Sequence, residues 1–567
     1  MKRFYISVML CVAAMCAWAQ APMPEWTKQL VNLNPEVIDS IQRFAIDPEL
    51  LADYDLTPAD MQTRTYIVYY HQPVKHSNPT GPQFSLRATI TVFNDADVTT
   101  AVNHLYCGGY ALQKDWLKMP DAMFVTGKNE SDMEIAHRYH ANFISLEYRY
   151  FQYSAPERCY ENLDDLRSEE AAEDFHNLLT ALKKVMKGKW VMSGVSKGGA
   201  ATLLQHAFHP EDADIFVPYS APFFDTNCDT VMQTYWQTHG WNKEYRDMIM
   251  DICRQFTQRE ATIYPLFYKM MKDDSKTDDY VYGRYLATAA HFGYQEHTYS
   301  DTAELRKNID FNGNMMYLYD VHQYNDTVYA IMAINGQFKL NGFGNWIDWL
   351  RSNPGAGSPS RPARSAHSVG QLPFGVTEAE WWGNETIGKA EQAYEYQSKT
   401  ELGYYDLRFD LIVGAESAPA WNAAYKKYVG TLRDFDNPYY ASCAFNRSLY
   451  DLATSTTKNA TKPIIFLYGE DDSWTGAAMK DRFVNGTNVQ KFILPAQNHG
   501  VHFTSNTDPA KCKQITDILD GVLGAPQTAL TTIPQPDVLR VRKVLRDGML
   551  LIERDGQLYT MEGRKAE

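Results

Sequence analysis

The apolar and polar positions of this chain follow two periods, one typical of strands and one typical of helices. Residues 64–70 and 84–93 alternate along their length, which predicts two strands of a meander. Residues 143–150 form the next strand-like run, a helical pattern covers 168–184, and 213–221 returns to a strand pattern. Strands that alternate with helices predict an α/β fold with a doubly wound sheet.

A glycine-rich break interrupts the apolar run at residues 189–204. Its centre reads Gly194-Val-Ser-Lys-Gly-Gly199, and helical spacing resumes afterwards. Glycines two residues before and after Ser196 predict a nucleophile elbow, a tight strand-to-helix turn that exposes a serine hydroxyl where a Cβ would clash. Because short Gly-Ser strings are common, an ordinary N-cap serine is the alternative.

A second strand-like run, at residues 463–474, ends in a candidate acid. Asp472 lies three residues beyond Gly469, in the loop that follows the run. A carboxylate just past a strand can orient a histidine without joining the core. Glu470 and Asp471 are its competitors, and they are more simply interpreted as solvated loop residues.

A third run, at residues 489–495, leads into a candidate base at His499, with His502 as its rival. Elbow-type serine hydrolases place the acid and then the histidine downstream of the serine, which is the order Ser196, Asp472, His499. His499 would take the serine proton during attack on a carbonyl, while Asp472 would fix the imidazole tautomer.

The oxyanion formed in such a reaction needs two hydrogen-bond donors. The backbone N–H of Lys197, directly after the nucleophile, is expected to be one of them. The second is expected from the loop after the strand-like run at residues 102–107, where Gly108, Gly109 and Tyr110 are the candidates. A plain hairpin turn is the alternative there.

Length and charge limit the remaining possibilities. A chain of 567 residues is too long for one core and predicts two or three structural units. Its formal net charge of −15 argues against nucleic acid or an anionic membrane as a partner. Neither a C-x-x-C nor an H-E-x-x-H pattern is present, so the sequence supports no metal, and no cofactor is expected.

The first 19 residues predict a signal peptide: Met1-Lys-Arg is positive, residues 4–16 are apolar but too short to span a bilayer, and Ala17-Trp-Ala19 fits a cleavage site. We therefore expect an exported protein that is periplasmic, cell-surface or extracellular. No other run is long enough to span a membrane.

Removal of that segment would leave an even number of cysteines, which in an exported protein is consistent with disulfides. The sequence cannot choose among the 15 connectivities that six cysteines allow. Cys228 with Cys253 is the nearest local pair. The six are Cys107, Cys159, Cys228, Cys253, Cys443 and Cys512.

The chain divides by pattern into a core of two parts, an insertion and a tail. Residues 225–455 are rich in Tyr, Trp and helix-like segments and predict a helical cap over the site, within which 353–368 resembles a mobile stretch. Trp381 and Trp382 could line its roof, although packing is the simpler role. The core is expected at 20–224 and 456–525. Residues 526–567 contain a Pro/Thr-rich linker and then two Asp-Gly turns between alternating runs, which predicts a β-hairpin tail. This tail is expected either to attach the protein to the cell envelope or to pack as an edge strand.

A family resemblance rests on several of these segments in order: residues 146–156, Asn162-Leu163, 169–174, the elbow, and 218–222. The chain resembles the Pro-X serine peptidases, prolyl carboxypeptidase and dipeptidyl-peptidase II, and more closely the secreted bacterial serine tripeptidyl aminopeptidases. Val195 and Lys197 depart from the Pro-X pattern, which puts a proline preference in doubt. The resemblance implies an α/β-hydrolase domain with a helical cap and a Ser/Asp/His triad.

The function that follows is an exported serine exopeptidase that releases tripeptides or dipeptides from the free N-terminus of peptide substrates through an acyl-enzyme on Ser196. An esterase or lipase-like hydrolase is the first alternative, since a triad does not distinguish ester from amide. A catalytically silent surface binding protein on the same fold is the second.

Overall fold

The computed structural model describes most of the predicted core and parts of the insertion. The described residues are 22–44, 61–112, 130–156, 163–226, 231–239, 277–290, 409–432 and 444–526, the strands within 541–559, and scattered residues in 51–60, 254–268 and 393–404. The expected signal peptide, the 353–368 stretch, Trp381 and Trp382 lie outside them. Among the described residues no helix is both long and apolar enough to cross a membrane.

Nine strands form one mixed sheet in the order β1-β2-β3-β5-β4-β6-β7-β8-β9. The first four in this order pair antiparallel, and β5, β4, β6, β7, β8 and β9 pair in parallel. This is the predicted doubly wound α/β sheet, entered through a meander. The strands are β1 Ile38–Arg43, β2 Thr63–Pro73, β3 Gln83–Phe93, β4 Asn103–Cys107, β5 Asn142–Leu146, β6 Trp190–Val195, β7 Ile215–Tyr219, β8 Ile464–Gly469 and β9 Val489–Leu494.

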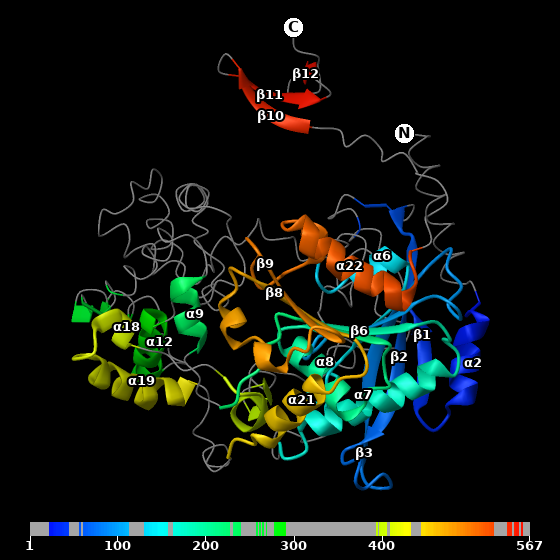
Figure 1. Cartoon of the computed structure of the whole chain (residues 1–567), viewed down its shortest axis with the longest axis horizontal. Coiled ribbons are helices and arrows are strands. Elements are labelled where there is room, and N and C mark those ends of the chain that lie inside the picture. The colour runs from blue at the N-terminus through cyan, green and yellow to red at the C-terminus, as the bar shows by residue number, and fades with distance from the viewer. Residues whose placement is uncertain are drawn as a thin grey trace. The chain divides into compact units, whose positions relative to one another are not determined.

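Helices cover both faces of the sheet, and alternate residues of its strands enter two separate cores (Figure 1). Phe466 and Tyr468 of β8 join the core on one face, whereas Ile465 and Leu467 join the core on the other. The first face carries α2 Glu25–Leu33, α7 Ser168–Lys183, α8 Lys197–Phe208 and α21 Ser448–Lys458, and the second carries α6 Glu134–Tyr139 and α22 Pro509–Leu523.

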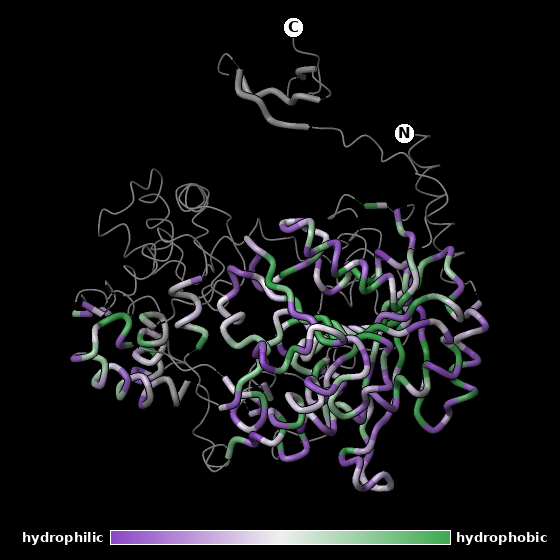
Figure 2. Tube along the Cα trace, in the orientation of Figure 1, coloured by the Kyte–Doolittle hydropathy of each residue, from purple (hydrophilic) through white to green (hydrophobic). Residues whose placement is uncertain are grey.

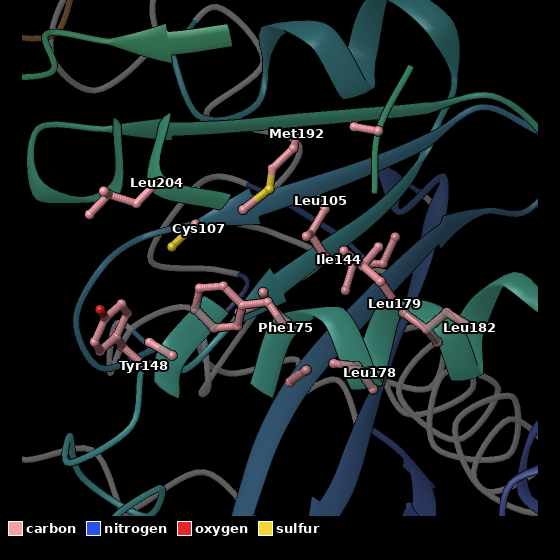
Figure 3. Packing of buried hydrophobic residues seen from close by; sticks show 14 of the residues in the cluster. Leu105, Cys107, Ile144, Tyr148, Phe175, Leu178, Leu179, Leu182, Met192 and Leu204 are labelled. Carbon is pink, nitrogen blue, oxygen red and sulfur yellow. The ribbon is translucent and has the colours of Figure 1, made fainter. Parts of the chain in front are cut away.

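Burial on both faces explains why the central strands are mostly apolar and give no alternating pattern (Figure 2). The first core is densest between α7 and the middle of the sheet. There Phe175, Leu178 and Leu182 of α7 pack toward Leu105 and Ile144 (Figure 3). Each fully buried leucine or phenylalanine in this layer contributes on the order of 2 kcal/mol.

Most of the described residues of the insertion lie in helices. Besides the start of α21, these include α9 Val231–Thr238, α12 Asp278–Ala290, the π-helix η4 Ser398–Leu402, α18 Asp410–Val413 and α19 Ala418–Leu432. Gly476, in the short 3₁₀ helix η5 Ser473–Ala477, lies against the backbone of α9 and has no room for a side chain. Two further 3₁₀ turns are η6 Asp481–Phe483 and η7 Phe503–Ser505.

The chain divides into two compact units, residues 1–524 and 525–567. In the second, β10 Val541–Arg546, β11 Met549–Arg554 and β12 Gln557–Tyr559 form an antiparallel three-stranded sheet. Val541 pairs with Arg554 and Arg546 with Met549, so the two strands pair along their full lengths. This unit therefore contains one strand more than a simple hairpin.

Candidate functional site

Ser196 lies in a strained turn between β6 and α8. Its φ of 59° and ψ of −122° are unusual for a residue with a side chain, and strain of this kind costs on the order of 1–3 kcal/mol. The strand ends at Val195 and the helix begins at Lys197, so the serine occupies the junction itself. Its N–H donates to the Tyr219 carbonyl of the neighbouring strand at 2.9 Å. This is the geometry of a nucleophile elbow.

The glycines around the serine leave space for backbone atoms of the neighbouring strands. A Cβ at Gly194 or at Gly198 would overlap the same atom, the carbonyl oxygen of Cys107 at the end of β4. At Gly199 a Cβ would lie 2.6 Å from the Tyr219 oxygen. The end of β4 therefore fits directly against the elbow, which brings the loop after Cys107 beside Ser196.

Asp472 lies in the loop after β8, with its side chain fully buried. One carboxylate oxygen accepts from the Trp474 N–H at 3.0 Å, which caps η5. The other lies 2.9 Å from Nδ1 of His499. The cap fixes the carboxylate and leaves its second oxygen to accept from the imidazole, so the proton lies on Nδ1 and Nε2 can act as a base.

His499 is held in the loop after β9 by its own backbone. Its carbonyl accepts from the Ser220 hydroxyl at 2.9 Å, and the Ser220 N–H donates to Leu467 of β8 at 2.7 Å. Gly469 at the end of β8 has no space for a Cβ because the carbonyls of the loop before His499 lie against it. Strands β6 to β9 are parallel, so Ser196, Asp472 and His499 all follow carboxyl ends at one edge of the sheet.

The alternative acids and the alternative histidine are not part of the buried Asp472–His499 pair. Glu470 is exposed. The Asp471 N–H donates to the Gln497 carbonyl at 2.8 Å, within the same pair of loops. His502 exchanges two backbone hydrogen bonds with the Gln497 side chain, at 2.9 and 3.0 Å, and burial lowers its pKa. His502 therefore shapes the loop, and His499 is the histidine paired with a buried acid.

Two residues that support this loop have no recognisable sequence motif. The Gln497 amide also donates to Thr507 at 3.0 Å, which cross-links the turn. Glu134 of α6 accepts from the Tyr219 hydroxyl at 2.9 Å and from the N–H groups of Phe503 and Thr504 at 3.2 and 3.0 Å. It is fully buried, and this burial raises its pKa to about 8. Glu134 joins the end of β7 to the segment after His499.

Two charged residues in segment 146–156, which carries part of the family resemblance, are structural. Glu147 forms a buried two-point ion pair with Arg87, at 2.8 and 2.9 Å. Arg149 does the same with Asp174 of α7, at 2.6 and 2.8 Å. All four side chains are buried, so removal of one member of a pair would leave an unpaired buried charge. Glu147 and Arg149 thus maintain the scaffold.

The expected oxyanion donors have different environments. Lys197 begins α8, so its N–H lies at a helix N-terminus beside the nucleophile. Gly108, Gly109 and Tyr110 follow the end of β4, which lies against the elbow, and all three stay candidates for the second donor.

The expected disulfide framework is wrong for two of its six cysteines. Cys107 and Cys512 are both buried free thiols. Burial raises the pKa of Cys107 to about 12, so it stays protonated. The suggested pair of Cys228 and Cys253 lies outside the described residues, as do Cys159 and Cys443.

One group of described side chains has metal-ligand chemistry: His176, His209 and Asp212. The two imidazoles are stacked, with centroids 4.1 Å apart and planes 11° from parallel. Each already has a carboxylate partner, at 2.8 Å for His176 with Asp212 and 2.9 Å for His209 with Glu173. Because ring lone pairs lie in the ring planes, parallel rings do not direct them to one point. We assign no metal to this group.

The sheet order, the elbow and the buried Asp472–His499 pair define the chain as an α/β-hydrolase. Residues 57–285 match the family described as PS-10 peptidase S37. A prolyl tri/tetrapeptidyl aminopeptidase from Streptomyces mobaraensis is 23% identical over 469 residues, which cover 82% of this chain and 81% of that protein. Part of the chain is therefore similar to the S37 peptidases, which confirms the resemblance found in the sequence.

The chain also has similarity to solved structures of hydrolases. The peroxisomal α/β-hydrolase Lpx1 from Saccharomyces cerevisiae has a TM-score of 0.32 and 12% identity, and the match covers 84% of this chain and 94% of that one. The cell-wall-degrading esterase LipA from Xanthomonas oryzae has a TM-score of 0.29 and 10% identity, with 86% and 99% covered. We draw no functional conclusion from these likenesses.

Proposed function

We propose that this chain is a serine aminopeptidase that releases tripeptides or dipeptides from the free N-terminus of peptides, with Ser196 as nucleophile, His499 as base and Asp472 as the orienting acid. The observation that carries the proposal is the buried 2.9 Å contact between Asp472 and His499, at the same sheet edge as a strained serine elbow. The S37 match over residues 57–285 supports a peptide bond as the target.

The chemistry would proceed in two steps. The hydroxyl of Ser196 attacks the scissile carbonyl while Nε2 of His499 takes its proton, and the imidazolium is stabilised by Asp472. His499 then protonates the leaving amine, and the N-terminal fragment stays on Ser196 as an ester. Water, activated by the same histidine, releases that fragment. The N–H of Lys197 donates to the oxyanion in both steps.

The length of the released fragment is the finer part of the proposal. The Streptomyces relative is named for the release of tri- and tetrapeptides, which favours three residues over two. A free-amine requirement implies a group that binds an ammonium ion near the site, and an acidic side chain suits that task. Glu401 of η4 does not suit this task, because its carboxylate already accepts hydrogen bonds from the N–H and hydroxyl of Ser168 at the start of α7, at 2.8 and 2.9 Å.

Fluorogenic di- and tripeptide amides, each with a free amine and again N-acetylated, test this proposal. We expect cleavage of the free-amine tripeptides, little cleavage of the acetylated forms, and none of either by Ser196→Ala. Equal cleavage of both forms, or activity on short acyl esters alone, would reject the aminopeptidase in favour of an esterase. No activity and no covalent capture of a fluorophosphonate would favour a silent binding protein.

We also propose that the enzyme is exported. The support is the positive, apolar and small-residue sequence of residues 1–19. The N-terminal sequence of the protein from its native cells tests this, with Gln20 as the expected first residue and an intact Met1 as the contrary result.

A further inference from the structure

The side chain of Lys197, next to the nucleophile, lies in an unusual place for a charged group. Its residue is only 3% exposed, and Nζ is surrounded by three aromatic rings. The ring centroids of Tyr148, Phe151 and Tyr110 are 3.8, 4.5 and 5.0 Å from Nζ. Among the described residues no carboxylate forms an ion pair with it, so the aromatic faces and one backbone oxygen stabilise the ammonium.

That backbone oxygen is the carbonyl of Gly109, to which Nζ donates a short hydrogen bond. Gly109 has a φ of +76°, and a Cβ there would lie 2.8 Å from the Gly198 nitrogen and 3.0 Å from the Lys197 carbonyl carbon. The loop therefore touches the first turn of α8 on one side, while the lysine side chain binds its carbonyl. Lys197 contacts this loop through both its backbone and its ammonium.

A trans peptide unit is planar, with its C=O and N–H pointing in opposite directions. When the Gly109 carbonyl points toward Nζ, the N–H of Tyr110, in the same peptide unit, must point the opposite way. The ammonium also polarises the peptide, which strengthens the opposite N–H as a donor.

From this geometry we propose that Lys197 is a positioning residue for the oxyanion hole: its ammonium holds the Gly109 carbonyl and so aims the Tyr110 N–H at the oxyanion formed on the Ser196 adduct. The proposal rests on the proposed function only in taking Ser196 as the nucleophile. One residue would then serve both donors, the first through its own N–H and the second through its side chain.

The environment of the ammonium supports a functional reason for its burial. Desolvation lowers the pKa of Lys197 to about 7, and the titratable groups that face it, Cys107 and the buried carboxyl of Glu401, offset this only in part. Below that pH the folded protein keeps a charge in an apolar cage at a cost in stability. A methionine of similar length would remove the cost, so packing alone gives no reason for a lysine here.

The test compares native protein with Lys197→Met, using a tripeptide amide as substrate and the matching tripeptide aldehyde as inhibitor. The aldehyde forms a tetrahedral adduct with the serine and needs the oxyanion donors, whereas KM for the amide reflects mainly ground-state binding. We expect kcat and aldehyde affinity to fall together, by roughly 10- to 100-fold, with KM within about threefold of native. The melting temperature is expected to be at least as high as that of the native protein.

Unchanged kcat and aldehyde affinity in folded Lys197→Met would overturn the proposal. If Lys197→Met does not melt cooperatively, Lys197→Arg is measured instead, because arginine keeps a cationic donor at this position. A kcat within about tenfold of native supports the positioning role. A larger loss of kcat in folded Lys197→Arg rejects that role. Native protein that fails to cleave the amide or to bind the aldehyde would instead reject the proposed function, which separates the two failures.

Discussion

At the scale of single residues, the account depends on Asp472 rather than on the acids beside it. Three consecutive acids follow β8, and their sequence does not distinguish them. The structure does, because Asp472 alone is both buried and within 2.9 Å of His499. The offset of three residues beyond Gly469 predicted this choice, since it places the side chain past the strand end and against the next loop.

The first prediction concerns this acid. Asp472→Asn should lower kcat by roughly 10³- to 10⁴-fold, because an amide favours the wrong imidazole tautomer and cannot stabilise the imidazolium. Steady-state kinetics on a free-amine tripeptide amide measures the effect, with a thermal melt to show that the variant is folded. Asp471→Asn is the matched control and should stay near native. Similar losses in the two variants would contradict the assignment.

A second residue-scale prediction compares two adjacent glycines. Gly109→Ala should reduce both activity and stability, since a left-handed φ costs a side chain about 1–2 kcal/mol and its Cβ would press on the first turn of α8. Gly108→Ala is the control, because the nearest atom to its Cβ would be 3.6 Å away. Urea unfolding and kcat measured together check this. If Gly108→Ala were destabilised and Gly109→Ala were native-like, the claim that Gly109 is the glycine without room for a side chain would be wrong.

At the scale of elements, the sequence predicted most of the sheet and missed the supports of the site. Strands β2, β3 and β7 and helix α7 lie where the periodicity places them, whereas the run at 143–150 forms a strand only to Leu146. Beyond that point Glu147 and Arg149 turn inward to bury their charges, which a strand pattern cannot reveal. β1 was missed because its six residues carry a mixed pattern, with only Ile38 fully buried.

Glu134 shows why such supports escape sequence analysis. It lies on α6, more than 350 positions before the loop that it holds, and only the closed sheet brings the two together. No local spacing marks it. The same holds for Lys197, whose place in the elbow was evident while its aromatic cage was not, because the rings come from separate loops.

The third prediction follows from the raised pKa of Glu134, about 8 in the folded protein. The folded state keeps a proton that the unfolded chain releases near pH 4.5, so native stability should fall as pH rises from about 4.5 to 8. Glu134→Gln cannot titrate. The free energy of unfolding of native protein minus that of Glu134→Gln should therefore decrease by on the order of a few kcal/mol across this range.

Urea unfolding of the two proteins at pH 5, 7 and 9 gives this difference directly. A difference that stays constant with pH would show that Glu134 is ionised in both states. The argument that burial dominates its environment would then be wrong, although its two hydrogen bonds to the segment after His499 and its one hydrogen bond to Tyr219 would remain.

At the scale of the whole molecule, the chain separates the catalytic unit from a small C-terminal β unit. Residues 1–524 contain the sheet and every residue assigned to the site, and residues 525–567 form a second compact unit. The Pro/Thr-rich linker predicted a boundary at this position. The insertion at 225–455 is the part that sequence describes least, because aromatic residues at helical spacing do not show which of them face a substrate.

The fourth prediction is that removal of residues 525–567 leaves the chemistry intact. The truncated enzyme should keep kcat within about twofold of native and the same melting temperature, since residues 525–567 form a compact unit of their own. The truncated chain with Ser196→Ala is the inactive control for background hydrolysis. A large loss of activity would show that the tail completes the site.

The central claim is that Ser196 is an activated nucleophile, and covalent labelling tests it most directly. Native protein is treated with a fluorophosphonate, digested, and examined by mass spectrometry for the site of modification. The account predicts one adduct, on Ser196, whose formation is slowed in Asp472→Asn and absent in Ser196→Ala. An unlabelled native protein, or an adduct that persists in Ser196→Ala, would contradict it.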